Sequence, residues 1–336
     1  MKRVLLIATG GTIASKHTQA GLTPQISGKE LLSFIPEAKK FCRIDVVQPF
    51  NLDSTNVQWE QWLILAGLVR EHYAFYDGFV ICHGTDTMAY TAAALSYLIR
   101  HSDKPIVVTG AQRPIDLPDT DARTNLLDSV RFASDDRAHD VNIVFGGSVI
   151  AGTRAKKERT KSYDAFSSIN FPPVAVIQDR RIIFYIDDKG QVREPVCFSD
   201  RLGERVFLYR LIPGSDGNIL DALMDRYDAL IIESFGVGGI PDYGDGSFKE
   251  AIRKWTAAGK IVVMATQVPN EGSDMSVYEV GHAVKNAYNI PESYDMTLEA
   301  VIAKTMWILG QTKDQRTFRR LFYTSVNHDL LFTPEE

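Results

Sequence analysis

The chain has 336 residues, of which 45% are hydrophobic and 24% charged, and its formal net charge is −5. This composition is typical of a globular protein, and the length predicts two domains. The acidic balance and the lack of a Lys/Arg block argue against a nucleic-acid partner, and no apolar run approaches the ~20 residues of a membrane-spanning helix.

The cysteines and histidines argue against a disulfide-linked protein and against a metalloprotein. Cys42, Cys82 and Cys197 are scattered and form no C-x-x-C pair, which argues against a disulfide framework. The seven histidines show no metal-ligand spacing, so we expect no metal. The short apolar run after Lys2-Arg3 ends in Thr-Gly-Gly and does not fit a signal peptide, and the sparse cysteines fit a reducing compartment best.

The first predicted strand, residues 3–8, is a continuous apolar run, which is typical of a strand buried on both faces of a parallel sheet. Gly10 and Gly11 follow it and carry Thr12 to the strand's carboxyl end, where open parallel sheets bind ligands. The turn matches neither nucleotide-binding glycine motif. Taken alone, the turn is more typical of a simple tight turn than of a ligand site, because strand–glycine turns are common in α/β folds.

The next segment, residues 15–24, is polar and carries Gly and Pro, so it is predicted to be a loop. Its place beside Thr12 makes it a candidate lid, and a plain surface connection is the alternative.

A second strand, residues 43–47, leads to Asp53 and Ser54, which either cap the following helix or bind a ligand. That helix is predicted over residues 57–73. Its expected inward stripe is Trp59, Trp62, Leu63, Ala66 and Val69.

The third strand–helix unit carries an unusual number of polar groups. Strand 78–82 runs into the turn His83-Gly84-Thr85-Asp86-Thr87, and a helix is predicted over residues 88–100. A helix cap explains one of these polar side chains but not the set. The turn is therefore a candidate site.

The remaining segments continue the strand–helix alternation. Residues 105–109 and 140–145 are predicted strands around helix 123–132, and the cationic run 152–161 is typical of a solvated surface, above all at Arg159 and Lys161. Beyond a linker the alternation resumes, with strands at 206–212, 228–233 and 260–266 and helices at 219–227, 248–258 and 296–309.

This pattern predicts an α/β protein with two parallel-sheet, three-layer domains. The larger N-terminal domain, residues 1–186, is expected to be flavodoxin-like. A linker over residues 187–205 precedes a smaller, Rossmann-like C-terminal domain, residues 206–336.

Thr12, Ser54, Thr85 and Asp86 all follow strands of one predicted parallel sheet, so their side chains should converge. No Cys–His pair and no G-x-S-x-G motif is present. A threonine can act as a nucleophile when a base activates it, and a neutral lysine can be that base.

Two segments at these strand ends resemble the signatures of one family. Residues 9–14, TGGTIA, and residues 83–88, HGTDTM, resemble the two signatures of bacterial-type L-asparaginases, and residues 109–112, TGAQ, also match. The resemblance covers nearly the whole chain and is strongest to the type I, cytoplasmic branch. It implies hydrolysis of L-asparagine to L-aspartate and ammonia through a threonine acyl-enzyme, in asparagine catabolism, without a cofactor, by a homodimer or homotetramer.

Carried over to this chain, the resemblance makes Thr12 the nucleophile and Thr85 the threonine that positions or activates water. Lys157 would be the partner of Thr85, with Lys156 and Lys161 as alternatives. A nearby Asp86 would favour a charged amine, which orients Thr85 instead of acting as a base.

The resemblance also assigns the substrate contacts. Asp86 would bind the α-ammonium, Ser54 with Asp53 the α-carboxylate region, and Ala111 the side-chain amide. Leu22 stands where many family members carry a lid tyrosine, so a phenol cannot activate Thr12 here. Water, Thr85 or Lys157 would do that work, or another residue replaces the phenol.

Two alternatives remain open at this point. One is a related amidase of the same fold, a glutaminase or the transamidase subunit acting on glutamyl-tRNA. That subunit usually carries an N-terminal extension, whereas the first strand here starts at Arg3, and the basic surface that tRNA requires is missing. The other is a non-catalytic amino-acid sensor, which would bind without releasing ammonia.

Overall fold

The computed structural model divides the chain into two compact units, residues 1–200 and 201–336. The residues that it describes are 1–19, 21–187, 194–241 and 246–331. Among them, no helix is long and apolar enough to cross a membrane.

The boundary falls inside the segment predicted as a linker, residues 187–205. Residues 188–193 of that segment lie outside the described residues. Beyond them, strand β14 (Cys197–Phe198) pairs antiparallel with β6 (Ile99–Arg100) of the first unit. The helix predicted over residues 88–100 therefore ends earlier, at Leu98.

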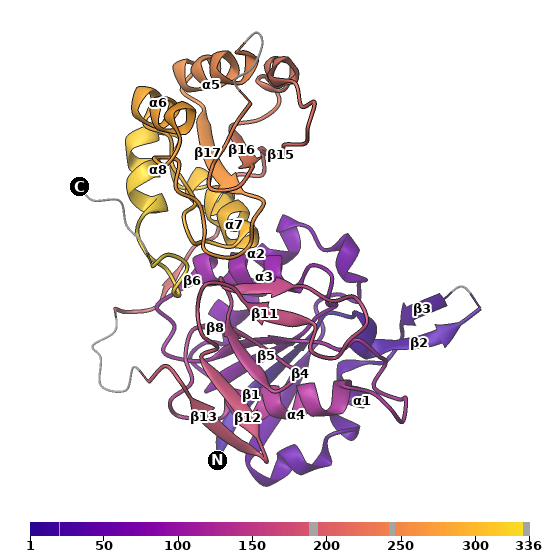
Figure 1. Ribbon diagram of the computed structural model, residues 1–336. Coiled ribbons are helices and arrows are strands. Elements are labelled where there is room, and N and C mark those ends of the chain that lie inside the picture. The colour runs from indigo at the N-terminus through magenta and orange to yellow at the C-terminus, as the bar shows by residue number, and fades with distance from the viewer. Residues whose placement is uncertain (20, 188–193, 242–245, 332–336) are drawn as a thin grey trace. The chain divides into compact units, whose positions relative to one another are not determined.

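The first unit contains an eight-stranded sheet in the order β13-β12-β9-β8-β7-β5-β1-β4 (Figure 1). Its parallel part consists of β4 (Cys42–Val47), β1 (Lys2–Ala8), β5 (Gly78–Cys82), β7 (Ile106–Thr109) and β8 (Val141–Phe145). Numbered along the chain, these strands have the order 2-1-3-4-5 of a flavodoxin-like sheet. Such a sheet binds ligands where the order reverses, between β1 and β5.

The two-domain α/β prediction is confirmed, but the sheet is mixed, not purely parallel. Strands β9 (Ser148–Ala151), β12 (Ala175–Gln178) and β13 (Arg181–Phe184) extend it in antiparallel pairing. The change of direction occurs at Gly146 and Gly147, whose φ angles of 57° and 78° suit a two-residue hairpin turn. A two-residue connection cannot return a strand in parallel.

Helices cover both faces of this sheet (Figure 1). Val4 and Leu6 of β1 share a buried core with α1 (Gly28–Ser33) and α4 (Ala122–Ala133). Helix α2 (Trp59–His72) packs on α3 (Met88–Leu98), which contacts β7 and β8. The buried stripe of α2 is Trp62, Leu65, Ala66 and Val69, so the expected stripe was wrong at Trp59 and Leu63, which are only partly buried.

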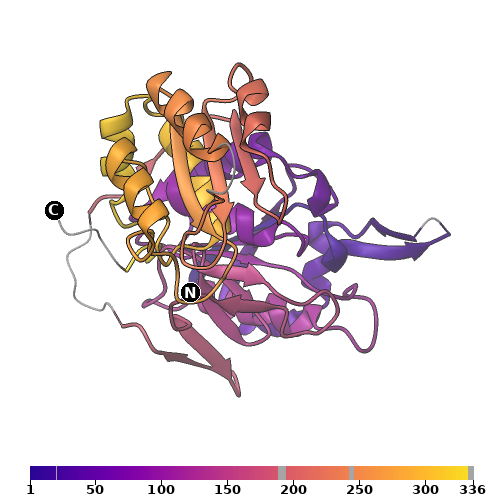
Figure 2. The same cartoon turned by 45° about the horizontal axis from the view of Figure 1, so that its top comes forward.

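Residues 15–24 form a β-hairpin where a loop was predicted. Strands β2 (Ser15–Thr18) and β3 (Gly21–Pro24) extend away from the sheet in both views (Figures 1 and 2), and Ala20 lies outside the described residues. The amides of Gln25 and Ile26 anchor the base of the hairpin by donating to the carbonyl oxygen of Ala14.

The second unit is built on a parallel sheet of β15 (Val206–Arg210), β16 (Ala229–Ser234) and β17 (Ile261–Thr266). Its helices are α5 (Ser247–Ala257), α6 (Glu279–Tyr288), α7 (Leu298–Leu309) and α8 (Gln315–Phe322). The predicted helix 219–227 is instead a 3₁₀ segment, η4 (Gly217–Leu223). Helices α6 and α8 were not predicted.

Candidate active site

The turn after β1 lies in backbone contact with the turn after β5. Gly11 has a φ of 74°, and a Cβ there would lie 2.3 Å from the backbone nitrogen of Gly84. Because β1 pairs with β5, with Ala8 opposite Cys82, the two turns leave neighbouring strand ends at the point where the strand order reverses. Glycine at position 11 is what permits this approach.

Thr12 follows Gly11 and begins the short 3₁₀ segment η1 (Thr12–Ala14). Its side chain is partly exposed, and its hydroxyl has no hydrogen-bond partner among the described residues. The hydroxyl is therefore open to a ligand, and in the described part of the chain no base lies within hydrogen-bond reach of it.

Thr85, Asp86 and Lys157 are brought together by side-chain contacts. The Nζ of Lys157 lies 2.8 Å from the Oγ1 of Thr85 and 2.6 Å from the Oδ1 of Asp86. Thr85 is buried, whereas the Asp86 side chain is 57% exposed, so Asp86 can still contact a ligand. Its second oxygen has no partner among the residues described.

Lys157 reaches this position because the cationic run 152–161 is not solvated throughout. Lys157 is the last residue of β10 (Ala155–Lys157), which pairs antiparallel with β11 (Phe166–Ser168). Arg154, just before this strand, is fully buried, so the surface prediction is wrong there. Arg159 and Lys161 are exposed, as expected.

Ser54 is buried against the same turn. Its Oγ accepts from the backbone nitrogen of Asp86 at 3.3 Å, and its carbonyl oxygen accepts from Thr87 Oγ1 at 2.7 Å. Asp53 caps the 3₁₀ segment η3 (Ser54–Asn56), accepting from Thr55 at both N and Oγ1. The alternative that Asp53 or Ser54 caps α2 is wrong, because Gln58 holds that position.

His83 holds the turn from within the core. Its Nδ1 lies 2.7 Å from the carbonyl oxygen of Gly84, which can only accept, so Nδ1 carries the proton. Its Nε2 then accepts from Thr91 Oγ1 at 3.0 Å, and Thr91 accepts from Trp62 Nε1. Burial lowers the pKa of His83 to about 4, so the imidazole is neutral at pH 7.

Gln112 joins the cluster and was not singled out from the sequence. Thr85 Oγ1 donates to its Oε1 at 3.3 Å, while its Nε2 donates to the carbonyl oxygens of Arg159 at 3.3 Å and Ser162 at 3.1 Å. The neighbouring Ala111 is fully buried. The available signal was the position of Gln112 in the TGAQ segment, directly after β7.

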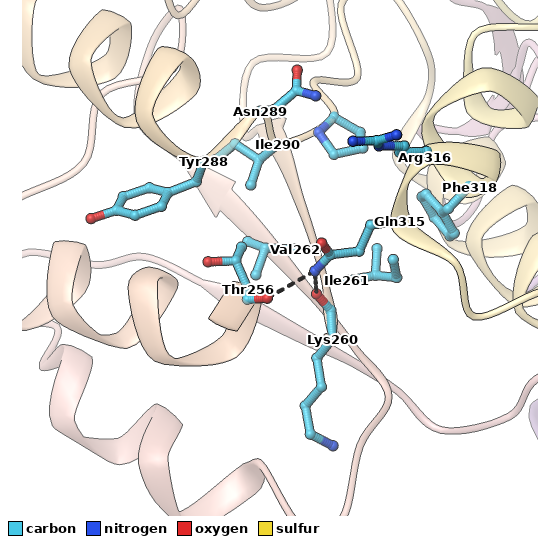
Figure 3. A pocket seen from close by; sticks show the side chains of 11 residues that line it. Thr256, Lys260, Ile261, Val262, Tyr288, Asn289, Ile290, Gln315, Arg316 and Phe318 are labelled. Atoms are coloured by element: carbon cyan, nitrogen blue, oxygen red, sulfur yellow. Dashed lines mark hydrogen bonds between the residues drawn. The ribbon is translucent and has the colours of Figure 1, made fainter. Parts of the chain in front are cut away.

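A pocket of about 170 Å³ in the second unit lacks comparable chemistry (Figure 3). The Nζ of Lys260 and the hydroxyl of Tyr288 point away from its centre (Figure 3), and Lys260 Nζ donates to the carbonyl oxygen of Tyr227. The Gln315 amide donates to the backbone carbonyls of Thr256 and Lys260. In the described part of the chain, no cluster of three His, Cys, Asp or Glu side chains could hold a metal.

Comparison with known proteins identifies related sequences over nearly the whole chain. The family model "Asparaginase, N-terminal" matches residues 3–189, and "Glutaminase/Asparaginase C-terminal domain" matches residues 205–322. An L-asparaginase from Thermococcus kodakarensis is 36% identical over 325 residues, covering 96% of this chain and 98% of the relative. A solved structure of the thermostable L-asparaginase from that organism has a TM-score of 0.91 at 34% identity, covering 98% of this chain and 100% of the other.

Two further relatives bear on function and location. A subunit of the glutamyl-tRNA(Gln) amidotransferase of Pyrococcus furiosus is 35% identical over 335 residues, covering 96% of this chain and 75% of the relative. A structure described as a probable cytoplasmic L-asparaginase from Campylobacter jejuni has a TM-score of 0.80 at 25% identity, covering 96% of this chain and 99% of the other.

Proposed function

Because the chain belongs to the asparaginase family, we propose that its strand-end cluster hydrolyses the side-chain amide of L-asparagine to L-aspartate and ammonia. The observation that carries the proposal is the contact of Lys157 with both Thr85 and Asp86. This group lies beside the turn that carries Thr12, whose hydroxyl has no partner within the described ranges. The cluster contains the parts of a double displacement: a hydroxyl nucleophile, a second hydroxyl, a cation and a carboxylate.

In the first step, Thr12 Oγ1 attacks the side-chain amide carbon. The new C–O bond replaces the C–N bond, the Thr12 proton ends on the leaving ammonia, and a β-acyl ester remains on Thr12. Backbone N–H groups near Thr12 and Thr85 stabilise the oxyanion, an effect worth about 3–4 kcal/mol per donor in comparable sites.

In the second step, water attacks the ester carbon, its proton passes to Thr12 Oγ1, and aspartate is released. Thr85 orients this water, and Lys157 stabilises the developing charge as an ammonium that donates to Thr85 and Asp86. The free oxygen of Asp86 binds the α-ammonium of the substrate.

Other residues position the substrate. Ser54, with Asp53 beside it, lies where the α-carboxylate region would be recognised, and Ala111 borders the side-chain amide. Because the Asp53 carboxylate already caps η3, its part in this contact is indirect.

Glutamine is the second candidate substrate, because the relative from Pyrococcus furiosus belongs to a glutamyl-tRNA(Gln) amidotransferase. One methylene distinguishes glutamine from asparagine, and such a difference is worth about 1–3 kcal/mol of discrimination. Ammonia release from the two amino acids at matched concentrations measures the preference directly.

We also propose that the enzyme is a homodimer or homotetramer in the cytoplasm. The oligomer follows from the family resemblance, and the location is supported by the similarity to a probable cytoplasmic L-asparaginase. Light scattering at assay concentrations tests the first part, and a fully active monomer would contradict it. Cell fractionation tests the second.

The decisive experiment separates the two threonines. The Thr12→Ala protein should form no covalent adduct with asparagine, whereas Thr85→Val should accumulate an acyl-enzyme that peptide mapping places on Thr12. Thr256→Val is a matched control, because its hydroxyl donates only to carbonyls of its own helix. A wild-type protein that releases no ammonia, or an adduct on Thr85 in the Thr12→Ala protein, would overturn the mechanism.

A further inference from the structure

We propose that Gln112 is a positioning residue that fixes the direction of the Thr85 hydroxyl proton and thereby makes Thr85 a hydrogen-bond acceptor toward water. The proposal rests on the proposed function, in which Thr85 governs hydrolysis of the acyl-enzyme. It concerns a residue that lies one position beyond Ala111 and whose side chain reaches Thr85.

The orientation of the Gln112 amide follows from its neighbours. Its Nε2 faces two backbone carbonyl oxygens, of Arg159 at 3.3 Å and of Ser162 at 3.1 Å. Carbonyl oxygens only accept hydrogen bonds, so the amide nitrogen must occupy this side. The amide oxygen of Gln112 therefore faces Thr85 and can only accept.

The Thr85 hydroxyl is thereby fully specified. It has one proton and two lone pairs, and its only neighbouring acceptor among these partners is Gln112 Oε1 at 3.3 Å. The hydroxyl proton consequently points to Gln112, while one lone pair accepts from Lys157 Nζ at 2.8 Å. The remaining lone pair is available to accept from the attacking water.

This arrangement also decides how Lys157 acts. A lysine that removes the Thr85 proton needs that proton to point toward its nitrogen, but the proton points toward Gln112. Lys157 instead donates to Thr85 and, at 2.6 Å, to Asp86. Gln112 thus keeps Lys157 in the role of a cation and Thr85 in the role of an acceptor.

A second set of bonds anchors Gln112 independently of its side chain. Its backbone nitrogen donates to both carboxylate oxygens of Asp121, at 3.1 and 2.9 Å. Asp121 is buried and also accepts from Arg113 N and Asn125 Nδ2. A side-chain substitution at position 112 therefore removes the amide while leaving the backbone anchor in place.

A double-mutant cycle tests the proposal, because it measures the coupling between two positions. Gln112→Met has a similar length, no hydrogen-bond donor and only a weak acceptor in its sulfur. We expect it to slow decay of the Thr12 adduct by 10- to 100-fold, with KM for asparagine changed less than threefold. In a Thr85→Val background the same substitution should change that decay less than threefold, because no hydroxyl proton remains to be oriented.

Thr85→Ser is the matched control background, since it keeps the hydroxyl and should retain the full effect of Gln112→Met. Equal effects of Gln112→Met in the Thr85→Val and Thr85→Ser backgrounds would overturn the inference. They would mean that Gln112 acts only through the carbonyls of residues 159 and 162.

Gln112→Glu keeps the test decisive even if Gln112→Met does not fold. A neutral carboxyl can donate to a carbonyl on the side that Nε2 occupies and accept from Thr85 on the other side, as the amide does, whereas an ionised carboxylate sets a second acceptor against those carbonyls. Adduct decay should therefore stay within tenfold of wild type at low pH and fall as the new carboxyl ionises. A loss that does not depend on pH would overturn the inference. If the wild-type protein releases no ammonia, both the proposed function and this inference are wrong. If the wild-type protein is active but the effects of Gln112→Met and Thr85→Val simply add, only this inference is wrong.

Discussion

Gly11→Ala tests whether the contact between the two strand-end turns carries the site. A Cβ at this position would lie 2.3 Å from the nitrogen and 2.4 Å from the Cα of Gly84, and the backbone φ is 74°. Both obstacles are backbone atoms, so no side chain can rotate out of the way. The turn after β1 must therefore move away from the turn after β5.

The expected cost follows from two terms. Overpacking of this kind costs about 1–3 kcal/mol, and an L-residue at the φ of 74° and ψ of −179° of Gly11 adds about 1–3 kcal/mol. Together they lower the free energy of unfolding by about 2–6 kcal/mol, or the Tm of the first unit by roughly 4–24 °C. A displacement of about 1 Å between Thr12 and Thr85 should also reduce kcat by about 100-fold.

Substitutions at two further glycines separate the cost of overpacking from the cost of the backbone conformation. A Cβ at Gly67, inside α2, meets nothing within 4 Å, so Gly67→Ala should stabilise the protein by about 0.5–1 kcal/mol. Gly21 has a φ of 110° and equally free surroundings, so Gly21→Ala should show the backbone term alone. Thermal unfolding and ammonia release measure all three variants. A Gly11→Ala protein that matches Gly21→Ala in both assays would refute the argument from close approach.

Three other substitutions have defined outcomes. Leu22→Ala in the hairpin should change kcat less than tenfold, because Leu22 is 44% exposed; a loss beyond a thousandfold, or ~4 kcal/mol, would contradict this. Lys304→Met removes the ammonium that lies 2.6 Å from the buried Asp329 carboxylate and should cost about 3–5 kcal/mol in urea unfolding; a cost below about 1 kcal/mol would contradict this. His83 has its pKa lowered to about 4 in the folded state, so the unfolded chain binds the proton first as the pH falls. Stability should therefore drop by about 3 kcal/mol between pH 6.5 and 4, and His83→Gln should remove that part of the pH dependence; an unchanged slope would refute the assignment.

The parts of this fold that the sequence predicts well are those with continuous apolar runs. Strands β1 and β5 are buried along most of their length. A parallel strand buried on both faces is a continuous apolar run without alternating polar residues, so it is easy to recognise in the sequence. Their polar ends then meet because parallel topology brings carboxyl ends to one edge of the sheet. This is why the sequence alone places Thr12 and Thr85 in one cluster.

Other features depend on information that local patterns do not carry. The hairpin turn at Gly146-Gly147 was a visible signal, but the short strands after it are too brief to distinguish from loops. The burial of Arg154 and the contacts of Gln112 depend on partners far along the chain; Gln112 binds carbonyls 47 and 50 residues away. Side-chain partners at such separations cannot be read from spacing.

The groups in the cluster that have hydrogen-bond partners, and those that have none, support the proposed steps of substrate binding and nucleophilic attack. Thr85 already donates to one group and accepts from another, and Ser54 is bonded through both its hydroxyl and its carbonyl. The groups without partners among the described residues are the Thr12 hydroxyl and the second oxygen of Asp86. A site whose supporting groups are fixed needs little reorganisation when charge develops. Substrate then supplies the two missing partners, an ammonium for Asp86 and an amide carbon for Thr12, so binding and nucleophilic attack require the same orientation of the substrate.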